Sequence, residues 1–316
     1  MSRWKRLGGT ATVLMILLFA GIVLSLAAGP AGVAAPWTIL RDLRIPRIIL
    51  AIVAGASLSV SGCVLQAVLR NPLATPYTLG ISAGAGVTAG VLILSGVVIP
   101  VFLVYLAGTL GALAAAGLTW FLAGRCRREP SSLILAGVTV NLLGASFLLL
   151  IEYISPASRL VEIVRWMMGD LAVAGYNRVL FLLPFFAIGI LIPILRTGTL
   201  NQFLAGTEMA ESRGVDTSRE RFLLLLSAAV LAGGTVGAVG PVGFIGLIVP
   251  HGVRRLSGGD YRKLLPLSAL GGSVLMVWAD LVSRTILSPA ELPIGVLLSL
   301  LGGPFFLYLL VKKPRL

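Results

Sequence analysis

The chain has 316 residues, of which 57% are hydrophobic and 12% charged, and its mean hydropathy is +1.00. A soluble domain of this size needs more charge on its surface, so this composition excludes a soluble enzyme and indicates a protein that crosses a membrane several times. The net charge is +13, but the basic residues lie in short segments between apolar runs, which favours membrane orientation over nucleic-acid binding as their role.

Ten apolar runs predict ten transmembrane helices, because one crossing of the bilayer core takes about 20 apolar residues. We therefore expect an all-α membrane protein with a single transmembrane domain over residues 1–316. The predicted helices cover 7–28, 46–68, 79–98, 101–123, 131–152, 178–195, 222–239, 243–253, 264–283 and 293–311.

The first and the eighth runs differ from the others. The first, 7–28, follows three basic residues and is longer than the apolar core of a cleavable signal peptide, so we interpret it as a signal anchor. The eighth, 243–253, is too short to cross the bilayer alone and follows Gly240-Pro241. It predicts a broken or partly re-entrant segment, whose irregular backbone must be buried in protein or line a cavity.

The basic residues orient the helices, because cytoplasmic segments carry an excess of Lys and Arg. With the N-terminus inside, only seven of the 25 basic residues fall outside: Arg41, Arg44, Arg47, Arg159, Arg165, Arg178 and Arg284. The others then lie inside, among them Arg127, Arg128, Lys312, Lys313 and Arg315. The bias predicts a multi-pass protein of the bacterial or archaeal cytoplasmic (inner) membrane with both termini in the cytoplasm. Cys63 and Cys126 would lie in the membrane and on the cytoplasmic side, where we expect no structural disulfide.

Two connections are long enough to fold. The outer, periplasmic one, 153–177, contains a segment predicted to form a helix at the membrane interface, Trp166-Met167-Met168. The inner one, 197–221, mixes four carboxylates with its arginines, and breaks at Gly206 and Gly214 would divide it into short helices. We interpret the inner connection as a docking surface for a cytoplasmic partner; the alternative is a solvated loop of mixed charge.

Several kinds of chemistry lack the residues that they need. The twelve carboxylates lie in or near predicted loops, whereas an ion-coupled carrier usually keeps an ionisable group near the membrane midplane. A stand-alone ion-coupled secondary transporter stays as the alternative, because backbone carbonyls also bind Na⁺. No lysine follows a GxxxxG phosphate loop, so any ATP must be bound by another subunit.

A serine hydrolase and a metal site are also considered. Ser82 in GISAG matches the GxSxG pattern of serine hydrolases, which needs a histidine in reach. The only histidine, His251, is distant in sequence, and a helix start rich in small residues explains the pattern equally. An intramembrane serine hydrolase is therefore the second alternative. One histidine with scattered cysteines predicts no metal site.

Four stretches together carry a resemblance to a known family. They are RIPR at 44–47; RNPLATP at 70–76 with LGISAGA at 79–85; GPVGFIGLIVPH at 240–251; and ADLVSR at 279–284 with ELPIG at 291–295 and LGGPFF at 301–306. In this combination, over nearly the whole chain, the sequence resembles the FecCD-type permeases. These are the membrane subunits of type II importers for iron–siderophore complexes, haem and vitamin B12.

The resemblance implies a function and a set of partners. It implies ten helices per subunit, a second permease subunit (we favour a homodimer over a heterodimer), two cytoplasmic ABC ATPase subunits and a periplasmic or lipid-anchored binding protein. ATP and Mg²⁺ would be used by the ATPase subunits, and this chain would have no catalytic residue and bind no cofactor or metal. It would move a ferric siderophore, haem or a cobalamin into the cytoplasm by alternating access.

The resemblance also implies roles for particular residues. The motif arginines Arg44, Arg47 and Arg284 match positions that dock the binding protein by pairing with its acidic residues; snorkelling of helix-end arginines to headgroups is the alternative. The inner connection matches the helices that couple the permease to its ATPase. The residues expected at that contact are Leu204, Gly206, Glu208, Ala210, Glu211, Arg213, Gly214 and Val215.

Overall fold

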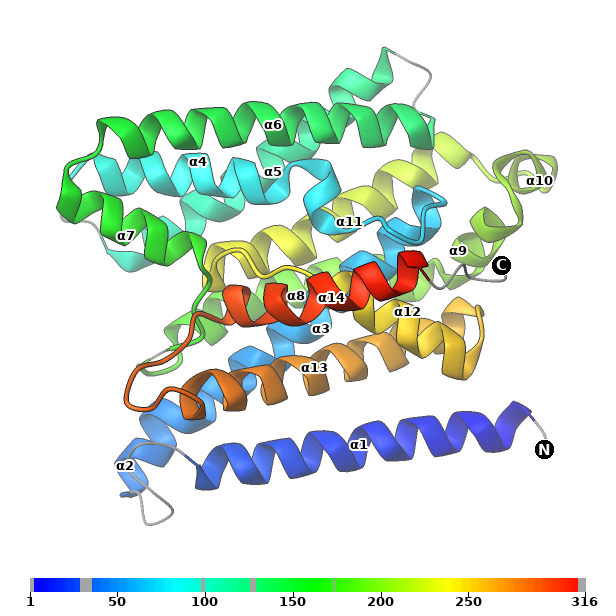
Figure 1. Ribbon diagram of the computed structural model, residues 1–316. Helices are drawn as coiled ribbons and strands as arrows, with labels where there is room; N and C mark the ends of the chain where they lie inside the picture. Colours follow the sequence, from blue (N-terminus) through cyan, green and yellow to red (C-terminus); the bar gives the residue numbers. More distant parts are fainter. Residues whose placement is uncertain (1–2, 29–35, 98–99, 126–128, 173, 312–316) are drawn as a thin grey trace.

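A computed structural model describes residues 3–28, 36–97, 100–125, 129–172 and 174–311, and this part of the chain contains helices and no strand (Figure 1). The long helices are α1 (Arg3–Ala27), α3 (Ile45–Val68), α4 (Ile81–Leu94), α5 (Val101–Gly124), α6 (Pro130–Ile154), α8 (Asn177–Leu195), α11 (Thr217–Val239), α12 (Ile245–Ser257), α13 (Tyr261–Thr285) and α14 (Ile294–Val311). Seven are long and apolar enough to cross a membrane, and α4, α12 and α14 are shorter. The predicted all-α membrane fold is confirmed.

Short elements connect these helices. They are α2 (Trp37–Ile39), which continues through a π-helical turn (Leu40–Arg44) into α3; a 3₁₀ turn (Pro76–Leu79) before α4; α7 (Ala157–Met167); α9 (Thr197–Ala205); and α10 (Thr207–Ser212). The helix predicted over 79–98 is shorter than expected, because Gly80 adopts a left-handed conformation that separates the 3₁₀ turn from α4. Its predicted end at Val98 lies outside the described residues, as do Cys126, Arg127, Arg128, Lys312, Lys313 and Arg315.

The core of the bundle is built on α3, which packs against α8, α11, α12 and α13. Glycines allow the closest crossing: a Cβ atom built on Gly55 would lie 2.3 Å from the carbonyl oxygen of Gly272 on α13. Such close approach is typical of helices that associate in lipid. Cys63 is buried in this core as a free thiol, and the buried Ser61 donates a 2.8 Å hydrogen bond to the carbonyl of Ala228.

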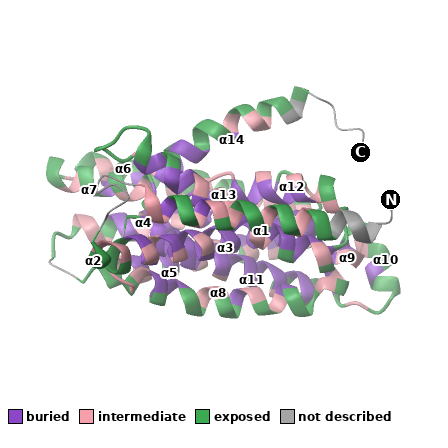
Figure 2. Ribbon diagram, turned by 90° about the horizontal axis from the view of Figure 1, so that it is seen from below, coloured by how far each residue is buried: buried purple, intermediate pink, exposed green. Residues whose placement is uncertain are grey.

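The outer helices have the opposite character. Large apolar side chains on α1, α5, α6 and α8 are exposed, among them Phe19, Phe121, Leu142, Phe147 and Leu191. Figure 2 shows exposed residues along the outer sides of the bundle and buried residues along α3 and α11. Apolar surface of this extent indicates contact with lipid or with another subunit.

The break before α12 lies where the sequence predicts one. α11 ends at Val239, Gly240 follows it with φ +75°, and the chain runs through 241–244 before α12 begins. A Cβ atom at Gly240 would lie 2.4 Å from the carbonyl oxygen of Trp166, so only glycine allows these two segments to meet. Pro250 lies within α12. The irregular backbone over 240–244 is buried or half-buried, and Gly240 lines a pocket, which fits the rule that such backbone in a membrane protein lies within the protein or along a cavity.

Candidate functional site

The described residues carry candidate sites at opposite ends of the bundle. Figure 1 shows α9, α10, the start of α1 and the end of α14 at one end, and α2 and α7 at the other. We call these the α9 end and the α7 end.

At the α7 end, Arg47 joins two helices by an ion-pair network. Its Nη2 lies 2.8 Å from Oδ1 of Asp280 on α13, and its Nη1 lies 2.9 Å from Oε2 of Glu291 in the following loop. The side chain of Asp280 is 2% exposed and that of Glu291 38%. Charged side chains that are buried need oppositely charged partners with good geometry. Arg47 has two such partners, Asp280 and Glu291.

The other two motif arginines are brought to the same place. Arg284 donates a 2.7 Å hydrogen bond to the carbonyl of Ser25 and lies 3.6 Å from Asp280. Arg44 donates to the carbonyl of Leu26. Both arginines are 5% exposed, so their side chains face the interior of this subunit and not its outer surface. Their role in docking stays a prediction.

Sequence reasoning missed the partner of these arginines. It placed Asp280 beside a loop, whereas the structure buries it within α13, one helical turn before Arg284. The spacing of Asp280 and Arg284, four residues apart on one helical face, is a signal from which sequence reasoning could have predicted an ion pair.

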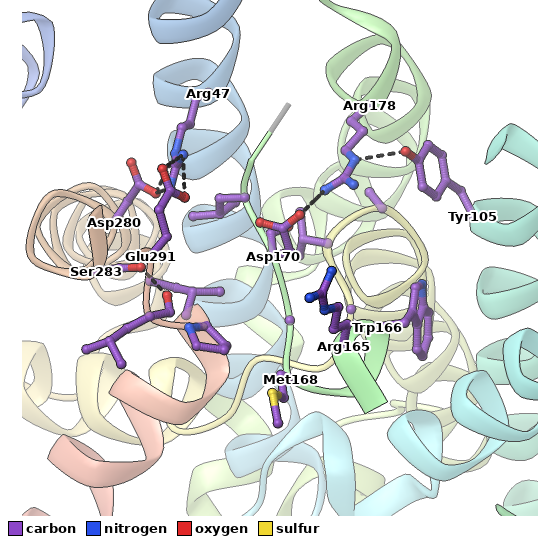
Figure 3. A pocket seen from close by; sticks show the side chains of 18 residues that line it. Arg47, Tyr105, Arg165, Trp166, Met168, Asp170, Arg178, Asp280, Ser283 and Glu291 are labelled. Carbon is purple, nitrogen blue, oxygen red and sulfur yellow. Dashed lines mark hydrogen bonds and ion pairs between the residues drawn. The ribbon is translucent and has the colours of Figure 1, made fainter. Parts of the chain in front are cut away.

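A pocket of about 440 Å³ opens at the α7 end (Figure 3). One wall carries Arg47, Asp280 and Glu291, and another carries a second charged group around Arg178. The Nε atom of Arg178 donates to the Tyr105 hydroxyl at 2.8 Å, and Nη1 donates to the Asp170 carbonyl at 3.0 Å. The Asp170 carboxylate lies 3.5 Å from the same Nη1.

Backbone hydrogen bonds join the segments beside the pocket. The Asp170 amide donates to the carbonyl of Val239 at 2.8 Å, and the Gly295 amide donates to the carbonyl of Met168 at 3.0 Å. These two hydrogen bonds join the segment that follows α7 to the end of α11 and to the first turn of α14.

At the α9 end, the inner connection folds into two short helices. α9 ends at Ala205, Gly206 takes φ +122°, and α10 runs to Ser212, before Gly214 at φ +80°. α11 already begins at Thr217, within the range 197–221. The two glycines therefore mark the ends of the two short helices: Gly206 separates α9 from α10, and Gly214 follows α10.

Two polar contacts hold this element to the bundle. Arg196, between α8 and α9, pairs at 2.9 Å with Glu220 in the first turn of α11. Asn201 on α9 donates to the Asp260 carboxylate at 2.9 Å and accepts from the Tyr261 amide at the start of α13. The Asn201 hydrogen bond is the main cause that lowers the pKa of Asp260 below its ordinary value, so this carboxylate is charged at neutral pH.

The predicted ATPase-contact residues do not all face outward. The side chains of Leu204, Glu208, Glu211 and Arg213 are exposed, as is Gly214, while Gly206 and Val215 are half-buried. Ala210 is fully buried, so its side chain packs inside the element and does not form part of its surface. Sequence reasoning missed Met209, which is 48% exposed beside Glu208.

The hydrolase alternative finds no support in the geometry. Ser82 lies on α4, which packs against α5 and α6, and His251 lies on α12, which packs against α3 and α13. Among the residues that the structure describes, no three His, Cys, Asp or Glu side chains are grouped so that they would hold a metal ion.

Comparison with known proteins identifies relatives over nearly the whole chain. The model of the FecCD transport family matches residues 10–312. The hemin transport system permease protein HmuU of Yersinia pestis is 38% identical, with 88% of this chain and 85% of that protein covered. The vitamin B12 import system permease protein BtuC of Vibrio cholerae is 37% identical, with 98% and 95% covered.

A solved structure has the same fold. It is described as an inward-facing conformation of a metal-chelate type ABC transporter, and it superposes with a TM-score of 0.88 at 30% identity, covering 98% of this chain and 99% of that one. The likeness therefore extends over all ten long helices and both candidate sites.

Proposed function

This chain belongs to the FecCD transport family, as a permease subunit of an ABC importer, and from that premise we propose that its cargo is a metal chelate: a ferric siderophore, haem or a cobalamin. The cargo of its relatives supports this class, since HmuU is named for hemin and BtuC for vitamin B12. The observation that supports a separate ATPase is the folded α9–α10 element, because an importer driven by another subunit needs a surface on which that subunit docks.

ATP hydrolysis belongs to a partner in this proposal. Two cytoplasmic ABC ATPase subunits bind the α9 end, where Leu204, Glu208, Met209 and Arg213 face outward. The pairs Arg196–Glu220 and Asn201–Asp260 transmit movement of this element into α8, α11 and α13. The permease works as a pair of subunits, for which we favour a homodimer.

The α7 end faces the extracytoplasmic binding protein. This orientation places both termini in the cytoplasm and the protein in the inner membrane, in agreement with the distribution of Lys and Arg. Arg44, Arg47 and Arg284 belong to this docking face. Because Arg47 is held from outside by the half-exposed Glu291, a carboxylate from the binding protein would reach it by exchange with Glu291.

An ion-coupled carrier is the weaker proposal. Such a carrier needs an ionisable group that is free to titrate during transport. Asp280 is the most deeply buried carboxylate among the described residues, and it is already held between Arg47 and Arg284. It therefore suits a fixed structural contact better than a coupling site.

The test is reconstitution. The tagged chain is purified with its ATPase, and ATP hydrolysis in liposomes is measured with binding protein loaded with ferric siderophore, haem or cobalamin. A stable complex stimulated by one loaded binding protein supports the importer and names its cargo. A chain that purifies without an ATPase and moves solute down an ion gradient would overturn the proposal.

A further inference from the structure

The α7-end pocket contains one arginine that pairs with none of its carboxylates. Arg47 is paired with Asp280 and Glu291, and Arg284 shares Asp280 with it. The second charged group, Arg178 with Asp170, is also paired. Arg165 also lines the pocket, and within the described ranges it has neither an ion pair nor a hydrogen bond.

Arg165 is placed to meet a group that enters from outside. It lies in the last turn of α7 and is exposed. Figure 3 shows its guanidinium in the pocket, below Asp170 and beside Trp166, with no dashed contact. A guanidinium in this position offers its full set of donors to an incoming anion.

The backbone beneath Arg165 is held firmly. The next residue, Trp166, packs so closely that a Cβ atom on Gly108 would lie 3.0 Å from its ring. The carbonyl of Met168 accepts the hydrogen bond from Gly295. The Arg165 side chain thus extends from a fixed segment, which lowers the ordering cost when a partner binds it.

We propose that Arg165 is the anchor for a carboxylate side chain of the extracytoplasmic binding protein, which enters the α7-end pocket when the two proteins dock. The inference rests on the proposed importer function. Arg165 differs from Arg47 in one respect. A carboxylate that reaches Arg47 must displace Glu291, whereas a carboxylate that reaches Arg165 displaces no protein group. An arginine–carboxylate contact is a strong, geometrically specific pair.

The occupant is a protein side chain because of the position and the charges of the pocket. It lies at the α7 end, where backbone hydrogen bonds tie the segment after α7 to the end of α11 and to the first turn of α14. Its lining includes three arginines and three carboxylates, unlike the apolar outer sides of the bundle. A projecting Asp or Glu matches the unpaired charge of Arg165 at this site.

The experiment uses the full permease–ATPase complex in phosphatidylcholine nanodiscs. The probe is the loaded binding protein that stimulates ATP hydrolysis by the wild-type complex. We expect Arg165→Ala to weaken its binding about tenfold, the value of one hydrogen bond to a charged group, and Arg165→Glu to weaken it further. Both effects should shrink at high salt. An Asp or Glu of the binding protein changed to Arg should restore binding to the Arg165→Glu complex.

Arg41→Glu is the matched control, because Arg41 lies at the same end, is 68% exposed at its side chain and does not line the pocket. Binding by Arg165→Glu equal to that of Arg41→Glu would overturn the proposal while leaving the importer intact. A loss confined to nanodiscs that contain phosphatidylglycerol would overturn it too, by identifying a lipid headgroup as the anion. If no loaded binding protein binds the wild-type complex, the importer function itself fails.

Discussion

The guanidinium of Arg47 lies 2.8 Å from the carboxylate of Asp280, although 233 residues separate them in the chain. The contact joins the first turn of α3 to the last two turns of α13. Both side chains are nearly excluded from solvent, at 11% and 2% exposure. Removing one member of a buried pair leaves the other charge unsatisfied, which costs more than the pair contributes. The contact therefore specifies how the two helices align at the α7 end.

Replacing Asp280 tests this role. We expect Asp280→Ala to lower the free energy of unfolding by about 3–5 kcal/mol, because Arg47 and Arg284 would stay buried without their shared partner. Glu291→Ala, which removes a half-exposed partner of Arg47, should cost about 1 kcal/mol or less. The free energies of unfolding of the two variants are measured by denaturant titration in the same detergent. Equal losses for the two variants would show that Asp280 does not hold this network together.

The glycine contact between α3 and α13 makes a second prediction. A methyl group at Gly55 would meet backbone atoms of Gly272, which have no side-chain freedom to yield. We expect Gly55→Ala to destabilise the bundle by about 1–3 kcal/mol, as overpacked cores do. Gly117→Ala on α5 is the control, since a Cβ atom there meets nothing within 4 Å, and it should be neutral or slightly stabilising. Thermal unfolding of the two variants tests this prediction. A Gly55→Ala variant as stable as the wild type would contradict the close crossing of α3 and α13.

The Arg196–Glu220 pair should transmit movement from the ATPase. Glu220→Gln removes the charge that holds the α8–α9 junction to α11. We expect ATP hydrolysis to continue while cargo uptake per ATP falls several-fold. Exchanging the two residues, Arg196→Glu with Glu220→Arg, should restore part of the uptake. If uptake per ATP stays normal in Glu220→Gln, the pair is structural only.

The α9–α10 surface makes a separate prediction about the ATPase. Gly206 has φ +122°, a backbone conformation that residues with a side chain rarely adopt. We therefore expect Gly206→Ala to reorient α10 against α9 and to uncouple ATP hydrolysis from uptake. Glu208→Ala should uncouple them through lost contact with the ATPase. Ser218→Ala, at an exposed position in the first turn of α11, is the control. Uptake and hydrolysis that remain coupled at normal rate in both variants would show that the ATPase contact lies elsewhere.

Much of the fold follows from local patterns in the sequence. Runs of about 20 apolar residues predict the long helices other than α12, since a bilayer allows little else. Gly206 and Gly240 mark breaks because their φ values are positive. In contrast, the pairing of Arg47 with Asp280 depends on how α3 and α13 cross, which no periodicity within either helix specifies.

The candidate docking site, too, is predicted from the sequence only in part. The motif identifies Arg44, Arg47 and Arg284 together, and the structure gathers them at one end, but it also buries Arg44 and Arg284. Arg165 belongs to none of the motif stretches, so sequence reasoning assigned it only a side of the membrane. Its place in the pocket depends on the packing of Trp166 and on the chain break at Gly240, both of which are tertiary features.

The central claim is that ATP, used by a separate subunit, drives a metal chelate through this permease. The most direct measurement is transport of the cargo across the membrane of liposomes that hold the chain and its ATPase. ATP is supplied on the side of the membrane where the ATPase lies, and loaded binding protein on the opposite side. We predict transport that needs ATP and the loaded binding protein and is unaffected when ion gradients are abolished. Uptake that persists without ATP and stops when an ion gradient is abolished would contradict the claim.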